Sequence, residues 1–213
     1  SNTCDVTVEV LDSISPVANC SSFTVTLGLN GIATVAPTAI DNGSFDNCGI
    51  ASYLINGNSV ETFNCTNVNT VNLVVLTVTD NNGNASFCTD TVTVEDVTSP
   101  QVQCIGAPVV YNLNASGTVT VNPQDLIVSA SDSCSIVNYY IDGLVDSTFD
   151  CSHINVTHLV EVRVEDPSFN SATCNALVSI VDNTPPDVSN ACQSNMTIAL
   201  DSSGVQVVTG ADI

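Results

Sequence analysis

The heptapeptide VEDVTSP at residues 94–100 has two counterparts in the chain, VLDSISP at 10–16 and IVDNTPP at 180–186. The first residues of the three copies lie 84 and 86 positions apart, and Cys88 likewise follows Cys4 by 84 positions. Self-similarity at a fixed period is the sequence signature of a repeat architecture. By the same alignment the ten cysteines reduce to one unit of four. The sequence therefore predicts tandem repeats.

The period divides the chain into four predicted parts. Residues 1–15 are the last strand of a truncated preceding repeat, 16–99 and 100–185 are whole repeats, and 186–213 are the start of a truncated following repeat. Each unit of such an array contacts its neighbours in the same chain. Neighbouring repeats are therefore the first partners that we expect.

Short β-branched runs alternate with polar turns inside each repeat, which is typical of strands. In the repeat at 16–99 the expected strands are 23–29, 32–35, 50–55, 60–63, 71–79 and 87–95. Asn30 and Gly31, between the first two, favour a two-residue hairpin turn. Six or seven strands in about 85 residues predict an all-β fold of immunoglobulin-like β-sandwich repeats.

The charge of the chain excludes two classes of partner. It has 22 acidic residues and a single basic residue, Arg163, and its formal net charge is −21. A polyanion cannot displace the counterions of phosphates, so nucleic acid is excluded. The sequence has no run of 18 apolar residues, so membrane insertion is not expected either. Repulsion among so many carboxylates instead favours divalent cations.

The cysteines recur at regular positions without CxxC pairs or Cys/His clusters, a pattern that favours disulfides over zinc or redox sites. We predict a Cys20–Cys88 bond, because the opening segment and the last strand of a sandwich lie side by side. A second bond, Cys48–Cys65, is predicted to close one strand–turn–strand segment. The corresponding bonds of the next repeat are Cys104–Cys174 and Cys134–Cys151. Four cysteines allow three connectivities, so Cys20–Cys48 with Cys65–Cys88 stays open.

Carboxylate and amide side chains recur in two kinds of loop, the DNNGN turn at 80–84 and the junction heptapeptide. Ca²⁺ takes six to eight oxygen ligands from such groups. If both loops lie at one end of the sandwich, a calcium ion can bridge them. The predicted ligands are Asp46, Asp80, Asn82, Asn84, Asp96, Asp132, Asp166, Asn170 and Asp182. The alternative is that Asp, Asn and Gly are turn formers whose side chains bond their own backbone.

Three motifs carry a resemblance to a known family: DNGSFDNCGI at 41–50, VTDNNGN at 78–84 followed by Cys88, and the Asp-x-x-x-Pro junctions. They resemble hyalin-type (HYR-like) repeats, and more closely the repeats of giant Bacteroidetes cell-surface proteins, such as gliding-motility adhesins and filaments exported by type IX secretion. The resemblance implies an extracellular, cell-surface immunoglobulin-like module used in adhesion or surface appendages. The second repeat departs from the pattern at 127–134 and 167–170.

These observations predict a structural segment of a repeat array, a stalk or fibre, in an extracellular adhesin or surface filament. Identical chains in a filament and surface glycans bound through other regions are further partners to consider. We expect no enzyme, because the only histidines, His153 and His158, occur in one repeat alone. The alternative is a carbohydrate-binding adhesion module that acts directly on glycans, with Tyr140 and Phe169 as candidate contacts.

Overall fold

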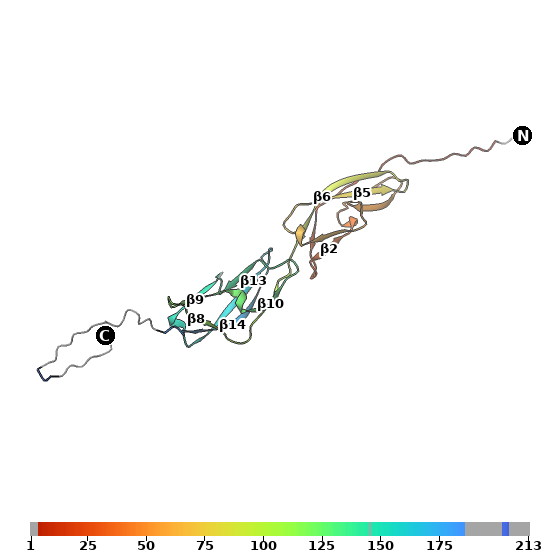
Figure 1. The fold of residues 1–213 in the computed structure, drawn as a ribbon. Helices are drawn as coiled ribbons and strands as arrows, with labels where there is room; N and C mark the ends of the chain where they lie inside the picture. The colour runs from red at the N-terminus through yellow and green to blue at the C-terminus, as the bar shows by residue number, and fades with distance from the viewer. Residues whose placement is uncertain (1–3, 145, 186–201, 205–213) are drawn as a thin grey trace.

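The strands form two successive groups along an elongated chain (Figure 1). The computed structural model describes residues 4–144, 146–185 and 202–204. The predicted start of a further repeat at 186–213 therefore lies outside the described residues, apart from 202–204. We call the group β1–β6 the first sandwich, the group β7–β14 the second sandwich, and residues 96–100 between them the junction.

The first sandwich pairs a sheet of four strands with a smaller sheet of two. Its strands are β1 (Phe23–Thr26), β2 (Ile32–Val35), β3 (Ile50–Ile55), β4 (Glu61–Asn64), β5 (Asn72–Asp80) and β6 (Ala85–Glu95). The large sheet has the order β1-β6-β5-β3, and β2 pairs with β4 in the small one. β1 runs parallel to β6, whereas all other pairs are antiparallel. The opening segment is held by bridges from Val17 to Phe45 and from Cys20 to Asp41.

The second sandwich has the same plan. Its strands are β7 (Gln101–Cys104), β8 (Val109–Asn112), β9 (Thr118–Val121), β10 (Ile127–Ser131), β11 (Asn138–Ile141), β12 (Ser147–Asp150), β13 (Thr157–Glu165) and β14 (Ser171–Val181). The large sheet is β11-β13-β14-β8, again with one parallel pair, β14 with β8. β9 pairs with β12, and β7 with β10. The fold is therefore all-β, with only short 3₁₀ turns among its described helices.

Each sandwich has its own hydrophobic core, because strand side chains alternate between the two faces of a sheet. In β5, Val74, Leu76 and Val78 point inward and are at most 1 % exposed, while Leu73 points outward. A fully buried side chain of this size contributes roughly 1.5–3 kcal/mol. Truncation of one such residue, as in Leu76→Ala, costs about 2–5 kcal/mol.

Two predicted local elements differ in the structure. The turn at 28–31 connects β1 to β2 but closes no hairpin, because β1 pairs with β6 in the other sheet. The two-residue hairpin turn predicted at Asn30 and Gly31 requires a positive φ at both residues. Only Gly31 has one, so this prediction is wrong. Residues 4–15 form no strand either: no strand of the described chain lies beside them to share backbone hydrogen bonds, and Val10 is exposed.

Candidate functional site

In each sandwich one disulfide connects the first segment to the last. Cys20 bonds Cys88 in β6, and Cys104 in β7 bonds Cys174 in β14. Both pairs are those predicted from the sequence, and the alternative pairing of Cys20 with Cys48 is not formed. The strands between each pair of cysteines are therefore enclosed in one covalent loop.

The third disulfide crosses from one sandwich to the other, between Cys65 and Cys134. The predicted bonds Cys48–Cys65 and Cys134–Cys151 are wrong, and Cys48 and Cys151 are free and exposed. The reason lies in strand direction. β3 and β4 belong to different sheets and both advance toward the junction, since β3 runs with β6 and β4 runs against β2. Cys48 and Cys65 thus lie at opposite ends of the first sandwich.

A cluster of three carboxylates lies where the chain enters the first sandwich. One oxygen each from Asp12, Asp46 and Asp80 lies within 4.8 Å of the others. Asp12 belongs to the first heptapeptide, Asp46 to the loop before β3, and Asp80 to the end of β5. Asp46 and Asp80 are among the metal ligands predicted from the sequence, whereas Asp12 is not. Its alignment with Asp96 is the signal that could have included it.

Hydrogen bonds fix the orientation of these carboxylates and leave part of them unpaired. Asp80 is 2 % exposed and accepts from the backbone N–H groups of Asn82 and Asn84, both at 2.8 Å. Asp12 and Asp46 each accept one backbone N–H through Oδ1, while their buried Oδ2 atoms have no partner. A buried polar atom without a partner costs roughly 1–3 kcal/mol, and more when charged. Two carboxylates that each have one unpaired buried oxygen therefore lie beside Asp80.

The same arrangement recurs at the junction. Asp96 and Asp132 come within 4.8 Å of each other, and each again has a buried Oδ2 without a partner. Asp96 is only 5 % exposed. Asp166 accepts from the backbone of Ser168 and Asn170 as Asp80 does in the first cluster. We call these the first cluster (Asp12, Asp46, Asp80) and the junction cluster (Asp96 and Asp132, with Asp166 as a nearby charge).

The predicted asparagine ligands have a different role. The side-chain amide of Asn84 donates to Asp80 Oδ2 at 2.7 Å and to the backbone oxygen of Asp12 at 3.1 Å. Asn170 makes the matching bonds to Asp166, at 2.8 Å, and Asp96, at 3.0 Å. Each amide thus positions a carboxylate and anchors the heptapeptide.

Two further predicted ligands lie outside these clusters. Asn82 contributes its backbone N–H to Asp80 and has an exposed side chain. Asp182 caps Thr184 N and, within the described residues, belongs to no acidic cluster.

The clusters also shift the pKa values of their members. Burial raises the pKa of Asp132, and the negative charges of Asp96 and Asp166 raise it further, against a lowering hydrogen bond from Cys134 N. Burial would also raise the pKa of Asp80, but hydrogen bonds from Asn84, Asn82 and Gly83 outweigh it and lower this pKa. Hydrogen-bond donors therefore favour the charged form of Asp80, whereas burial and the neighbouring negative charges disfavour the charged form of Asp132.

The donor set fits a calcium ion. Two oxygens on opposite sides of Ca²⁺ lie about 5 Å apart, which accommodates the spacing of the first cluster. Hard oxygen donors and a local charge of up to −3 suit this ion better than a transition metal. In the junction cluster Cys134 also lies close, but its sulfur is bound in the disulfide.

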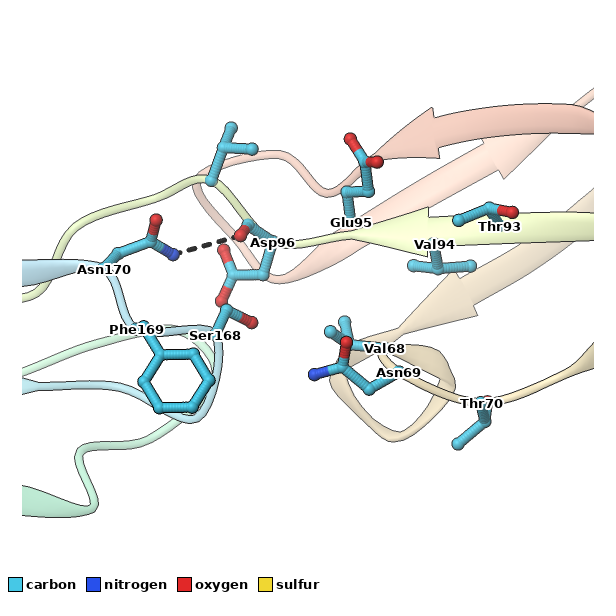
Figure 2. Close-up of a pocket in the computed structure, with 11 residues that line it drawn as sticks. Val68, Asn69, Thr70, Thr93, Val94, Glu95, Asp96, Ser168, Phe169 and Asn170 are labelled. Atoms are coloured by element: carbon cyan, nitrogen blue, oxygen red, sulfur yellow. Dashed lines mark hydrogen bonds between the residues drawn. The ribbon is translucent and has the colours of Figure 1, made fainter.

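A pocket of about 420 Å³ separates the two sandwiches beside the junction cluster. Figure 2 shows the loop 68–70 of the first sandwich on one side and the loop 168–170 of the second on the other, with Asn170 bonded to Asp96. Phe169, a candidate glycan contact, lines this pocket and is 79 % exposed. The other candidate, Tyr140, is partly buried, with the Arg163 guanidinium 4.5 Å from its ring centroid.

The two histidines replace asparagines and keep two of their hydrogen-bonding roles. In the first sandwich Asn64 and Asn67 form a reciprocal cap on η2 (Cys65–Asn67), and Asn72 donates to Asn67 O. His153 completes the same cap on η4 (Cys151–His153), and His158 Nε2 lies 2.9 Å from His153 O. Both rings are thus accounted for by the fold.

Replacing both histidines with asparagine, the residue at these positions in the first sandwich, tests this structural role. His153→Asn/His158→Asn is expected to change the free energy of unfolding by less than about 0.5 kcal/mol. His153→Ala/His158→Ala, which removes both the cap and the bond, should cost roughly 1–3 kcal/mol. Chemical denaturation measures both, and an equal loss in the two variants would contradict the assignment.

No family model matches the chain, and no curated protein matches it. Among solved structures, the N-terminal four Ig domains of Dscam1 isoform 8.4 have a TM-score of 0.38 and 10 % identity, over 83 % of this chain and 49 % of that one. The fibronectin(III)-like modules of Clostridium thermocellum CbhA have a TM-score of 0.28 and 13 % identity, over 81 % and 94 %. Human mucin-like protocadherin EC1-2 has a TM-score of 0.36 and 14 % identity, over 79 % and 98 %.

The structural neighbours are thus immunoglobulin, fibronectin-like and cadherin domains, and the likeness is one of general fold. The chain spans about half the length of the first of them. The resemblance to hyalin-type repeats and to Bacteroidetes surface proteins stays a prediction. In the described part of the chain, no helix has the length and apolar character needed to cross a bilayer.

Proposed function

We propose that this chain is a structural segment of an extracellular repeat array, in which disulfides make each repeat inextensible and each junction stiff. The two sandwiches are successive copies of one repeat of about 85 residues, as the shared topology and the sequence period suggest. Three disulfides require an oxidising compartment, which supports a secreted or surface-exposed location. The observation that carries the proposal is the Cys65–Cys134 bond.

Tension along the chain is carried by the disulfides and the linker rather than by the hydrogen-bonded sheets of the sandwiches. Force that arrives at Cys20 crosses its disulfide to Cys88, follows β6 and the junction to Cys104, and crosses the next disulfide to Cys174. The strands within each loop lie off this path, so they cannot unravel while the bond is intact. A covalent bond carries the force in place of a hydrogen-bonded sheet.

The Cys65–Cys134 bond gives the junction a second covalent connection. A single linker of a few residues lets two domains rotate about it, which is the default for domains with small interfaces. A bond from η2 (Cys65–Asn67) to the loop before β11 adds a strut beside the linker. Asn170, which donates to Asp96 O across the junction, adds a third attachment. Together these contacts oppose bending.

Calcium supports the same function as part of this proposal. Asp96 belongs to the junction, whereas Asp132 and Asp166 belong to the second sandwich, so an ion bound there would fix the linker to that sandwich. Bound Ca²⁺ supplies a positive charge that neutralises the repulsion among the carboxylates. Asn170 positions Asp166, and Thr98 N orients Asp96.

Removal of the junction bond tests the proposal. In a Cys48→Ser/Cys151→Ser background, which removes two of the three free cysteines of the described residues and keeps Cys20–Cys88, Cys65–Cys134 and Cys104–Cys174, the chain should scatter X-rays as one stiff elongated particle. Adding Cys65→Ser/Cys134→Ser should broaden the distribution of interatomic distances, because the linker alone then connects the sandwiches. The thermal unfolding of the cores should change little. Superimposable scattering curves from the two proteins would contradict a stiffening role.

The finer assignment, a stalk or fibre of a Bacteroidetes surface adhesin exported by type IX secretion, rests on the sequence motifs. Direct glycan binding is the less favoured function, because Arg163 stacks on Tyr140 and the other aromatic candidate, Phe169, belongs to the junction pocket. Binding to a glycan array that is lost in Phe169→Gly, the residue of the first sandwich at this position, would favour it instead.

A further inference from the structure

We propose that Cys151 and Cys48 each form a disulfide with a neighbouring repeat, of the same kind as the bond between Cys65 and Cys134. Cys151 would bond the Cys48-type cysteine of a repeat that follows, and Cys48 the Cys151-type cysteine of a repeat that precedes. The partner is thus another repeat of this kind in head-to-tail order. This inference rests on the proposed repeat array, and it extends the bond seen between Cys65 and Cys134 to every junction.

Cys151 is held in the same position as Cys65. Both follow a strand of the small sheet and begin a single 3₁₀ turn with a reciprocal side-chain cap. The Cys65 sulfur lies 3.9 Å from Gly31 O, and the Cys151 sulfur 3.7 Å from Gly117 O. A Cβ on either glycine would lie 3.0 Å from the sulfur. Cys151 therefore already has the local structure that Cys65 has in the junction disulfide.

Cys48 is held in the same position as Cys134. The backbone N–H of Cys48 donates to Asp46 Oδ1 at 2.8 Å, and that of Cys134 to Asp132 Oδ1 at 2.7 Å. The next residue has a positive φ in both loops, 92° at Gly49 and 82° at Ser135. The Cys134 sulfur lies beside Asp96, and Asp12 is the counterpart of Asp96 in the first heptapeptide. Cys48 thus already has the local structure that Cys134 has in the junction disulfide.

Among the described residues, Cys65 has a second sandwich beside it and Cys151 does not. A Cβ on Gly31 would also lie 3.2 Å from the Ser133 backbone oxygen of the second sandwich, whereas a Cβ on Gly117 would approach only the Cys151 sulfur. Cys48 and Cys151 are exposed, and Cys65 and Cys134 are partly buried. Within the described part of the chain, the surface beside Gly117 is therefore open to a loop like the one that contains Ser133.

The chemistry is a thiol oxidation that needs an external oxidant. The Cys151 and Cys48-type thiols lose two protons and two electrons and form one S–S bond. A small-molecule disulfide such as oxidised glutathione accepts them and is reduced to two thiols, by exchange through a mixed disulfide. No atom of the protein besides the two sulfurs changes its bonding.

A chain with one repeat duplicated tests the inference in cis. A second copy of residues 100–185 is inserted directly after residue 185 of the full chain, and the protein is oxidised with glutathione. Non-reducing peptide mapping, with a protease that cuts at acidic residues, should find Cys151 of the first copy bonded to Cys134 of the second. Cys151→Ser in the first copy should leave that Cys134 as a free thiol. Recovery of Cys151 as a free thiol, with Cys65–Cys134 still formed, would overturn this inference while the proposed function stands.

Mixing of single variants gives a second test that needs no duplicated repeat. In a Cys4→Ser/Cys192→Ser background, the oxidised chain should form a ladder of head-to-tail multimers. Cys48→Ser or Cys151→Ser alone should stay monomeric, and a mixture of the two should stop at a dimer. Dimers in either single variant would indicate random thiol pairing and would count against the inference, whereas loss of Cys65–Cys134 in all samples would instead refute the proposed function.

Discussion

Pulled from its two ends, a Cys20→Ser/Cys88→Ser chain is expected to release about 150 Å of contour from the first sandwich, whereas the parent chain releases neither sandwich. The bond that carried the force past the sandwich is gone, so its strands now lie on the force path. The released stretch is 20–65, because Cys65 stays attached to the second sandwich through Cys134. Single-molecule force spectroscopy with terminal handles measures this length.

A second variant shows which bond limits the extension. Adding Cys65→Ser/Cys134→Ser frees the whole stretch of 68 residues between Cys20 and Cys88, so the release should rise to about 230 Å. In this second variant the second sandwich, closed by Cys104–Cys174, is the internal control and should stay locked, because force then enters it only at Cys104. Circular dichroism first establishes that the variants keep their β structure, since loss of such a loop costs about 4 kcal/mol. If the parent chain extends at low force by the contour length of one sandwich, the disulfides do not carry the force past the sandwiches and the proposal is refuted.

The sequence predicted the strands well because alternation is a local property. β2 and β3 begin and end at the expected residues, and β4–β6 differ by one or two. Strand pairing is not local. Asn30 and Gly31 favour a hairpin, yet the parallel pairing of β1 with β6, set by the core as a whole, overrode this preference. The bonds from Cys20 and from Cys104 were predictable because they join the two ends of one sandwich.

The junction bond was not predictable, because the period identifies equivalent cysteines and does not say which copies touch. Cys48 and Cys65 are close in sequence and lie at opposite ends of the first sandwich, and only the direction of β4 reveals this. A calcium site required the 80–84 turn and the heptapeptide to lie at one end of the sandwich, and the structure brings Asp80 and Asp12 together there. It also gives the amides of Asn84 and Asn170 a donor role, which residue type alone does not distinguish from that of a ligand.

Calcium is expected to raise the unfolding midpoint of the parent chain, and to raise that of Asp96→Asn/Asp132→Asn by less, because the variant keeps only the first cluster. At a concentration of 100 times Kd, one site contributes about 2.7 kcal/mol, which corresponds to a shift on the order of 10 °C for a domain of this size. In the presence of a chelator the order should reverse. The variant should then be at least as stable as the parent, because it no longer buries two repelling carboxylates beside Asp166.

Asparagine is the matched substitution here, because its side-chain oxygen can still accept from Thr98 N and Cys134 N, as Asp96 and Asp132 do. If these residues served only as turn formers, the variant would behave like the parent with and without calcium. Isothermal titration adds a count: two ions for the parent and one for the variant, since the first cluster is untouched. Equal stoichiometry in the two proteins, or midpoints that ignore both calcium and chelator, would exclude the junction as a calcium site.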